Sequence, residues 1–144
     1  ILNAYVLYPN RPQKFQANWN KIIALTAQAE NILNSPAIAP LLIEQGKQIV
    51  DSGENEYYYA TRPYTPFPLM PSYEEVVQRG QEYLNEVEDE VRRKSFDLVI
   101  ITENYSPFIS ERILRNYYTY FETIIVDMPQ TNQQWRLQVW IPKK

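Results

Sequence analysis

Three consecutive polar residues follow a strongly apolar segment of this sequence. Glu103, Asn104 and Tyr105 come directly after residues 96–102, which have the length and composition of a central β-strand. Open α/β sheets bind ligands beyond the carboxyl ends of such strands, so this position favours a binding role. The other interpretation is a polar turn that joins the strand to the next helix, because such a strand must end in polar residues.

An aromatic segment provides the second set of candidates. Residues 54–71 contain four prolines, which interrupt regular structure. Irregular segments of this length inside a compact domain are usually functional or disordered, and the aromatic content favours order. Aromatic side chains with Pro and Arg are typical of sugar-stacking platforms and of protein interfaces. Packing over a sheet edge as part of the core is the alternative. The candidate binding residues are Tyr57, Tyr58, Tyr59, Arg62, Tyr64 and Phe67.

Carboxylates and one serine complete the candidates. Glu54 with Glu56, and the acids within residues 86–90, could hold a hard cation through oxygen ligands. The acids of residues 86–90 fall outside the apolar stripe of their predicted helix, which indicates a solvated face. Ser35 precedes Pro36 at a strand-to-helix turn, but the chain has no histidine to activate a nucleophile, and helix capping explains this serine. We therefore predict no catalytic residue and no metal ligand.

Composition excludes several classes of protein. The chain has no Cys and no His, which removes disulfides and thiolate chemistry and leaves general acid–base work to carboxylates, Lys or Tyr. Its three glycines fit neither a dinucleotide-binding nor a P-loop pattern, so no cofactor is predicted. The net charge is −3 and the longest basic run is residues 92–94, so nucleic acid is not an expected partner. The apolar stretches are shorter than the roughly 20 residues that span a bilayer.

Hydrophobic periodicity predicts the elements that position these groups. The clearest helix begins with a capping box formed by Ser72 and Glu75 and continues to about residue 94. Other helices are predicted at 15–28 and after Ser106. Pro40 interrupts the segment that begins at Pro36, so a turn is predicted at 36–39, followed by a short helix to Gln45. Strands are predicted at 31–33, 47–50, 96–102, 120–126 and 135–141, and residues 1–8 could form another. The last two strands form an antiparallel pair, and we expect one face of the final strand to be exposed.

This order of elements predicts one α/β domain over residues 1–144. We expect a small three-layer Rossmann-like sheet that is mostly parallel and ends in an antiparallel C-terminal strand pair. A chain of this length buries about 68–70% of its unfolded surface, which is enough for one core without disulfides or metals.

Four segments, taken in order, resemble one family. They are SPAIAPLLIEQGKQIV at 35–50, FDLVI at 96–100, ERILRNYY at 111–118 and VWIP at 139–142. Within a match that covers residues 30–142, they resemble the C-terminal tail of polytopic membrane glycosyltransferases that use lipid-phosphate-linked sugars, the protein mannosyltransferase and aminoarabinose transferase group. In that group the tail follows the last membrane span and lies on the extracytoplasmic side of the cell membrane. The family's acidic catalytic loop has no counterpart here, so no catalytic residue is carried over.

The resemblance implies a non-catalytic accessory domain of a multi-pass enzyme, separated from its membrane part near Ile1. Its partners would be the membrane-embedded part of the same polypeptide and a lipid-linked sugar or its acceptor, which the domain would help to position; it could also simply stabilise the enzyme. Two further hypotheses remain. One is a free-standing α/β binding module or a small carboxylate-dependent enzyme that uses Glu103 or Asp51. The other is a protein-interaction domain that pairs through its exposed last strand.

Overall fold

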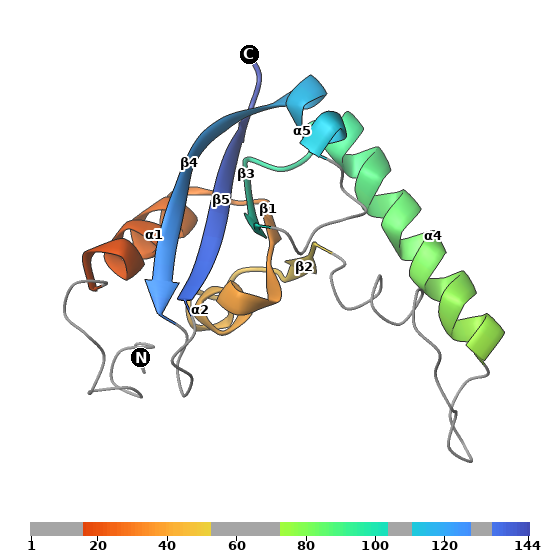
Figure 1. Cartoon of the computed structure of the whole chain (residues 1–144), viewed down its shortest axis with the longest axis horizontal. Helices are drawn as coiled ribbons and strands as arrows, with labels where there is room; N and C mark the ends of the chain where they lie inside the picture. Colours follow the sequence, from red (N-terminus) through yellow and green to blue (C-terminus); the bar gives the residue numbers. More distant parts are fainter. Residues whose placement is uncertain (1–15, 53–72, 104–110, 128–133) are drawn as a thin grey trace.

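The computed structural model describes residues 16–52, 73–103, 111–127 and 134–144 (Figure 1). Within these ranges the chain forms a five-stranded sheet with helices packed on both faces. The possible strand at residues 1–8 lies outside the described residues. The elements are α1 (Gln16–Gln28), β1 (Ile32–Asn34), the 3-10 helix η2 (Pro36–Ile38), α2 (Ala39–Glu44), β2 (Val50–Asp51), α4 (Tyr73–Arg92), β3 (Leu98–Thr102), α5 (Glu111–Tyr117), β4 (Tyr118–Asp127) and β5 (Gln134–Pro142).

The sheet is open and mixed, with the strand order β2-β1-β3-β5-β4. β1 pairs in parallel with β2 on one side and with β3 on the other. β5 is antiparallel to both of its neighbours, β3 and β4, so it alone runs against the other four strands. The predicted α/β class is confirmed, as are the mostly parallel sheet and its antiparallel C-terminal strands.

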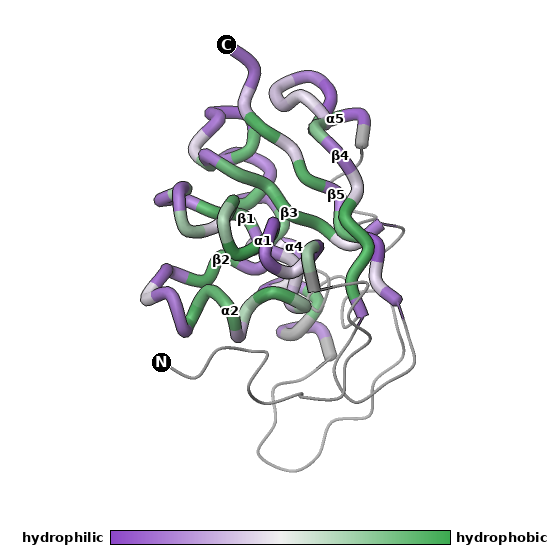
Figure 2. Tube along the Cα trace, turned by 90° about the vertical axis from the view of Figure 1, so that its left-hand side faces the viewer, coloured by the Kyte–Doolittle hydropathy of each residue, from purple (hydrophilic) through white to green (hydrophobic). Residues whose placement is uncertain are grey.

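Two clusters of buried side chains lie on the two faces of the sheet. One cluster joins α1, η2 and α2 to the face that carries Ile100 and Val139. The other joins α4 and α5 to the opposite face, which carries Val99 and Trp140. Figure 2 shows the hydrophobic residues concentrated along the central strands, as expected for strands that are covered on both sides. Burial of both faces of β3 explains why residues 98–101 are apolar without alternation.

The prediction that one face of the final strand is exposed was wrong. Trp140 is 1% exposed and Gln138 is 8% exposed, and Trp140 belongs to the buried cluster that contains Leu114 of α5 and Tyr118. Arg136, the third residue of that face, is exposed as expected. The hypothesis of pairing through an exposed last strand is also wrong, because β5 is hydrogen-bonded on both sides and the edge strands of the described sheet are β2 and β4.

Local sequence signals explain most of the element ends. Ser35 caps η2, since its hydroxyl accepts a hydrogen bond from the Ala37 N–H at 3.3 Å. Gly46, just after α2, has a φ of +69°, a left-handed conformation that glycine adopts without strain. In α4 the buried side chains Leu84, Val87 and Val91 recur at helical spacing, as predicted. β2 contains only Val50 and Asp51, so the predicted strand at 47–50 was placed too early and was too long.

The phenol of Tyr118 is buried where α5 runs directly into β4. Its oxygen accepts a hydrogen bond from the Phe96 N–H at 3.2 Å and donates one to the Phe96 carbonyl at 3.3 Å. Burial raises the pKa of Tyr118, while the hydrogen bond to Phe96 opposes this rise. The uncharged hydroxyl therefore links the start of β4 to the main chain of Phe96, just before β3.

We expect Tyr118→Phe to lower the free energy of unfolding by about 1–3 kcal/mol at neutral pH, because buried main-chain groups of Phe96 lose their partner. The difference should shrink above pH 10.0, the ordinary pKa of tyrosine. There the unfolded state releases the phenol proton before the folded state does, so only the wild type loses this part of its stability as the pH rises. Urea unfolding of both proteins from neutral to alkaline pH measures the effect, and parallel curves would contradict it.

Candidate functional site

The sheet reverses its winding at β1. α2 connects β1 to β2 across one face of the sheet, whereas α4 connects β2 to β3 across the other face. β2 and β3 therefore lie on opposite sides of β1, with all three strands parallel. In open α/β sheets, ligands bind outside the carboxyl ends of the strands at such a switch point. The polar residues that end these strands therefore form the candidate site. This group is called the carboxyl edge and consists of Asn34, Ser35, Ser52, Thr102 and Glu103.

Four of these residues form a buried hydrogen-bonded network. The Asn34 side chain accepts from the Val50 N–H at 3.1 Å and donates to the Ser35 carbonyl at 3.0 Å. The Asn34 carbonyl accepts from the Ser52 N–H at 2.7 Å, which ties β1 to the end of β2. The Ser35 and Thr102 hydroxyls lie 2.5 Å apart and join β1 to β3. Because Asn34, Ser35, Ser52 and Thr102 are all buried, these bonds hold three strand ends in one fixed arrangement.

The network does not have the chemistry of a catalytic centre. The Ser35 hydroxyl is engaged by the Thr102 hydroxyl and the Ala37 N–H, and both belong to the fold. A serine nucleophile needs an adjacent base, and the chain has no histidine. The capping role predicted for Ser35 is confirmed.

Glu103 is the most exposed member of the carboxyl edge. Its carboxylate forms an ion pair with Arg136 of β5, and its N–H donates to the Arg136 carbonyl at 2.8 Å. The side chains of Glu103 and Arg136 are 27% and 54% exposed. The pair closes the carboxyl edge on the β5 side and places one guanidinium and one carboxylate at the surface.

The other predicted site residues have different outcomes. Asn104 and Tyr105 lie outside the described residues, so of that predicted turn only Glu103 is placed. The aromatic candidates Tyr57, Tyr58, Tyr59, Arg62, Tyr64 and Phe67 also lie outside them. Asp51, the last residue of β2, accepts a hydrogen bond at its main-chain carbonyl from the Tyr83 hydroxyl at 2.6 Å. The acids of residues 86–90 are exposed or half-buried on α4, and Glu88 and Glu90 pair with Arg92 and Arg93.

The described residues contain neither a cluster of metal-ligating side chains nor a helix that could span a membrane. No three His, Cys, Asp or Glu side chains lie close enough together to hold a metal ion in this part of the chain. No helix within the described ranges is long and apolar enough to cross a membrane.

Asn34, Thr102 and Arg136 were not predicted from the sequence. The first two have a recognisable signal, because each is a polar residue placed at the end of a short apolar strand. Arg136 has none, because its partner Glu103 lies 33 residues earlier in the sequence and only the register of β3 with β5 brings the two together.

A cavity of about 240 Å³ lies at the other end of the sheet. It is lined by residues at the starts of β1, β2 and β3, including Ile32, Val50 and Phe96, with Glu30 and Glu90 among its polar residues. The polar groups of the carboxyl edge do not contribute to it.

Comparisons with protein-family models, with curated proteins and with solved structures each found no match. The function of this chain must therefore be inferred from the geometry of its fold and from the residues themselves.

Proposed function

We propose that this chain is a non-catalytic binding domain and that its ligand lies at the carboxyl edge. The observation that carries the proposal is the buried network of Asn34, Ser35, Ser52 and Thr102 at the switch point. These groups are satisfied by one another, which makes them a rigid support and leaves none of them positioned as a nucleophile or a general base. The three-layer Rossmann-like architecture belongs to the same proposal, and its support is the placement of α1 and α2 on one face and of α4 and α5 on the other.

The ligand class is inferred from the segments that leave this edge. Residues 53–72 continue from Ser52, and residues 104–110 continue from Glu103, so both segments with predicted binding residues are attached at the carboxyl edge. Tyr and Phe side chains stack on sugar rings, and arginine binds phosphate through paired hydrogen bonds. These residue types suit a sugar or a sugar phosphate.

We further propose the setting that the family resemblance implies, an accessory domain on the extracytoplasmic face of a membrane glycosyltransferase. The domain would hold the acceptor or the sugar of a lipid-linked donor near the membrane-embedded part of the same polypeptide, and it would also stabilise that enzyme. The engagement of the Ser35 hydroxyl by Thr102 and the Ala37 N–H, with no histidine in the chain, supports an accessory role.

Amide chemical-shift mapping by NMR tests the proposed site. A soluble analogue of a lipid-phosphate-linked sugar, and separately free oligosaccharides, would be added to the 144-residue chain. We expect shifts at the amides of Ser35, Ser52 and Glu103 and no transfer or hydrolysis of the sugar. Tyr58→Ala should weaken binding, whereas Tyr120→Ala, which removes an exposed tyrosine on the distant start of β4, should not.

Several results would contradict the proposal. Turnover by the isolated chain would identify an enzyme, and shifts confined to the starts of the parallel strands would move the site to the opposite end. Glu103→Gln separates the binding domain from a carboxylate-dependent enzyme. The enzyme should lose a measurable activity with its melting temperature unchanged, whereas a binding domain loses only the ion pair with Arg136, worth roughly 0–1 kcal/mol of stability at the surface.

A further inference from the structure

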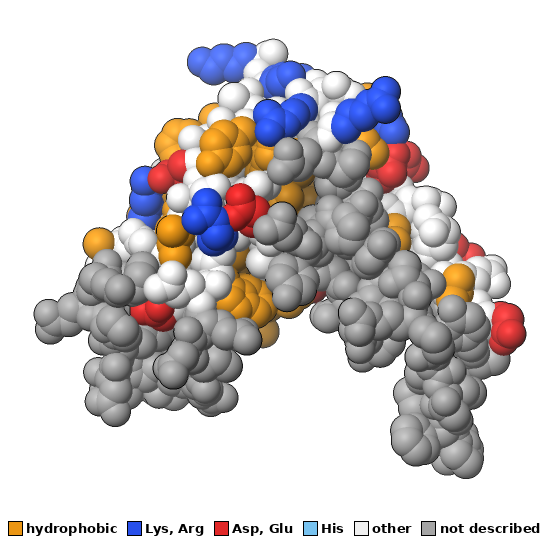
Figure 3. All heavy atoms as spheres, viewed as in Figure 1, with side chains coloured by type: hydrophobic (Ala, Val, Ile, Leu, Met, Phe, Trp, Pro, Cys, Tyr) orange, Lys and Arg blue, Asp and Glu red, His pale blue; other side chains and the backbone are white. Residues whose placement is uncertain are grey.

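Lys and Arg side chains gather at one end of the molecule, where the last turn of α4, α5 and the end of β5 meet (Figure 3). They include half of the chain's 14 Lys and Arg residues, although the whole chain has a net charge of −3. The charge is therefore unevenly distributed. This surface is called the basic corner below, and it consists of Arg92, Arg93, Lys94, Arg112, Arg115, Lys143 and Lys144.

Main-chain contacts hold the basic corner together. The Lys143 ammonium donates to the Arg115 carbonyl at 2.5 Å, and the Lys94 ammonium donates to the Lys143 carbonyl at 3.1 Å. The Lys143 N–H donates to the Tyr117 carbonyl at 3.0 Å, which fixes the chain after β5 against α5. In these bonds two ammonium groups are anchored by neutral carbonyls, so the contacts position the charges without neutralising them.

Nearby carboxylates are largely engaged. Glu88 and Glu90 pair with Arg92 and Arg93 at 2.5 and 2.8 Å. Asp97 accepts hydrogen bonds from the Glu30 and Asn31 N–H groups at 3.1 and 2.9 Å and so holds the start of β1 against β3. Glu86 and Asp89 are exposed acids on the same part of α4. Even when these acids are counted, the seven cations leave an excess of positive charge at this end.

Exposed apolar side chains lie beside the basic corner. Tyr120 and Phe121 on β4 are 43% and 52% exposed, and Tyr120 packs against Trp140. Ile141 on β5 is 38% exposed and projects from the other face of the sheet, because it alternates with Trp140. A β-bulge between Tyr120 and Glu122 leaves Phe121 without a partner on β5, and a bulge of this kind redirects a side chain. Figure 3 shows hydrophobic side chains over β4 next to Lys and Arg side chains.

Only part of the β4 edge is covered by the described residues. Asn18 of α1 donates to the Ile125 carbonyl at 2.6 Å, and Lys21 pairs with Glu122 at 2.5 Å. These contacts block the second half of the edge strand. The half that begins at Tyr118 carries the exposed aromatic residues and adjoins the basic corner, which makes a mixed apolar and cationic surface.

We propose that this surface binds an anionic lipid bilayer. Aromatic and aliphatic side chains enter the boundary between headgroups and acyl chains, while lysine and arginine interact with anionic phosphates around them. Because the chain as a whole is acidic, an anionic bilayer attracts this end and repels the rest, so charge selects one orientation. A second protein strand paired along β4 would not need the surrounding cations.

The proposed bilayer-binding surface of the protein and the carboxyl edge lie at opposite ends of the sheet. β5 runs antiparallel to β3, and Trp140 pairs with Val99 while Leu137 pairs with Thr102, so residues 143–144 lie near the start of β3. The bilayer proposal therefore stands independently of the proposed sugar site.

Vesicle co-sedimentation of the 144-residue chain tests the proposal. We expect binding to phosphatidylcholine vesicles that contain phosphatidylglycerol, little binding to pure phosphatidylcholine, and weaker binding as salt is raised. Arg112→Glu should weaken binding by about 5- to 30-fold, because it removes one positive charge and adds a negative one. Phe121→Ser should weaken it several fold through the lost apolar contact.

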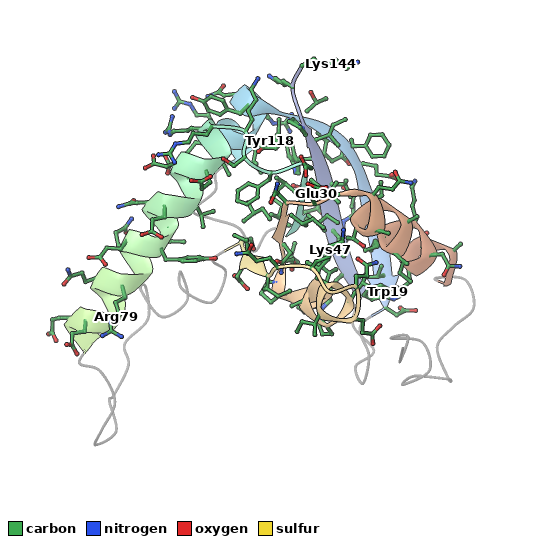
Figure 4. All side chains as sticks on the ribbon, turned by 180° about the vertical axis from the view of Figure 1, so that it is seen from behind. Trp19, Glu30, Lys47, Arg79, Tyr118 and Lys144 are labelled. Atoms are coloured by element: carbon green, nitrogen blue, oxygen red, sulfur yellow. The ribbon has the colours of Figure 1, made fainter. Side chains whose placement is uncertain are left out.

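Two matched variants serve as controls. Arg79→Glu changes the net charge by the same amount, but Figure 4 places Arg79 towards the other end of α4, away from Lys144. Ile43→Ser removes an exposed aliphatic side chain, 66% exposed, from α2. Both should bind as the wild type does, and far-UV circular dichroism checks that all four variants are folded.

Four outcomes would overturn the proposal. The first is no binding to anionic vesicles, and the second is equal binding to neutral vesicles. The third is a loss of vesicle binding in Arg79→Glu as large as that in Arg112→Glu. The fourth is full displacement of the chain from vesicles by phosphate at an ionic strength where chloride has little effect. The last outcome would indicate a site for a soluble anion. Light scattering that reveals a dimer lost in Phe121→Ser, with no vesicle binding, would instead identify the β4 edge as a contact between two copies.

Discussion

Replacing Trp140 with alanine should lower the free energy of unfolding by about 3–5 kcal/mol, the usual cost of removing a fully buried large aromatic side chain. Trp140 is 1% exposed and lies near the end of β5, between β3 and β4. Tyr120 meets its ring edge-on, with ring centroids 5.4 Å apart, and the Arg115 guanidinium lies 5.5 Å from the ring centre. The substitution therefore leaves a cavity and also removes the support for two surface residues.

Urea unfolding followed by circular dichroism measures this loss, which is a large fraction of the roughly 5–15 kcal/mol that stabilises a domain. Phe121→Ala is the matched control. It removes another aromatic residue from the same end of the sheet, but one that is half exposed, and it should change stability by no more than about 0.5 kcal/mol. Equal effects of the two substitutions would mean that the face of β5 that carries Trp140 is not buried.

Asn34→Asp should be nearly as destabilising at neutral pH, by about 3–5 kcal/mol, because it places an unpaired charge at a buried site. The amide group of Asn34 donates to the Ser35 carbonyl, and a carboxylate would instead set two oxygens against each other at 3.0 Å. The introduced acid is therefore more easily protonated in the folded state than in the unfolded state. Stability should be greatest at low pH and should fall as the pH rises through about 4, where the unfolded acid ionises.

Asn34→Ala separates the charge effect from the lost hydrogen bonds. This variant leaves the Val50 N–H without its partner and should cost about 1–3 kcal/mol, with no added dependence on pH around 4. Unfolding curves of both variants between acidic and neutral pH give the comparison. If Asn34→Asp and Asn34→Ala were equally stable at neutral pH, the end of β1 would be open to water and the proposed rigid support of the carboxyl edge would be wrong.

Local patterns predicted the elements well where one interaction dominates. Helical spacing predicted α4 because its buried side chains recur on a single stripe, and continuous apolar residues predicted β3 because both of its faces are covered. Ser35 before Pro36 predicted the cap of η2. Each of these signals involves residues close together in the sequence.

Strand order could not be predicted in the same way, because it depends on contacts between distant residues. The alternation of Arg136, Gln138 and Trp140 suggests a polar face, and only the packing of Leu114 and Tyr118 against Trp140 shows that most of that face is buried. The ion pair of Glu103 with Arg136 likewise depends on the register between β3 and β5. Of the candidate site, the sequence therefore indicated the position of Glu103 but not the buried network beside it.

The central position of β5 has a consequence for the order of folding. This strand follows all other described strands in the sequence, yet it lies between β3 and β4. While the chain is being synthesised, β3 and β4 emerge first, and each has an unpaired edge until β5 is complete. Such edges are templates for pairing with other chains. The sheet is closed only by long-range pairings such as Val99 with Trp140, which form slowly. The interval between the emergence of β3 and that of β5 is thus when a nascent chain is most exposed to aggregation, and a chaperone that covers strand edges would act then.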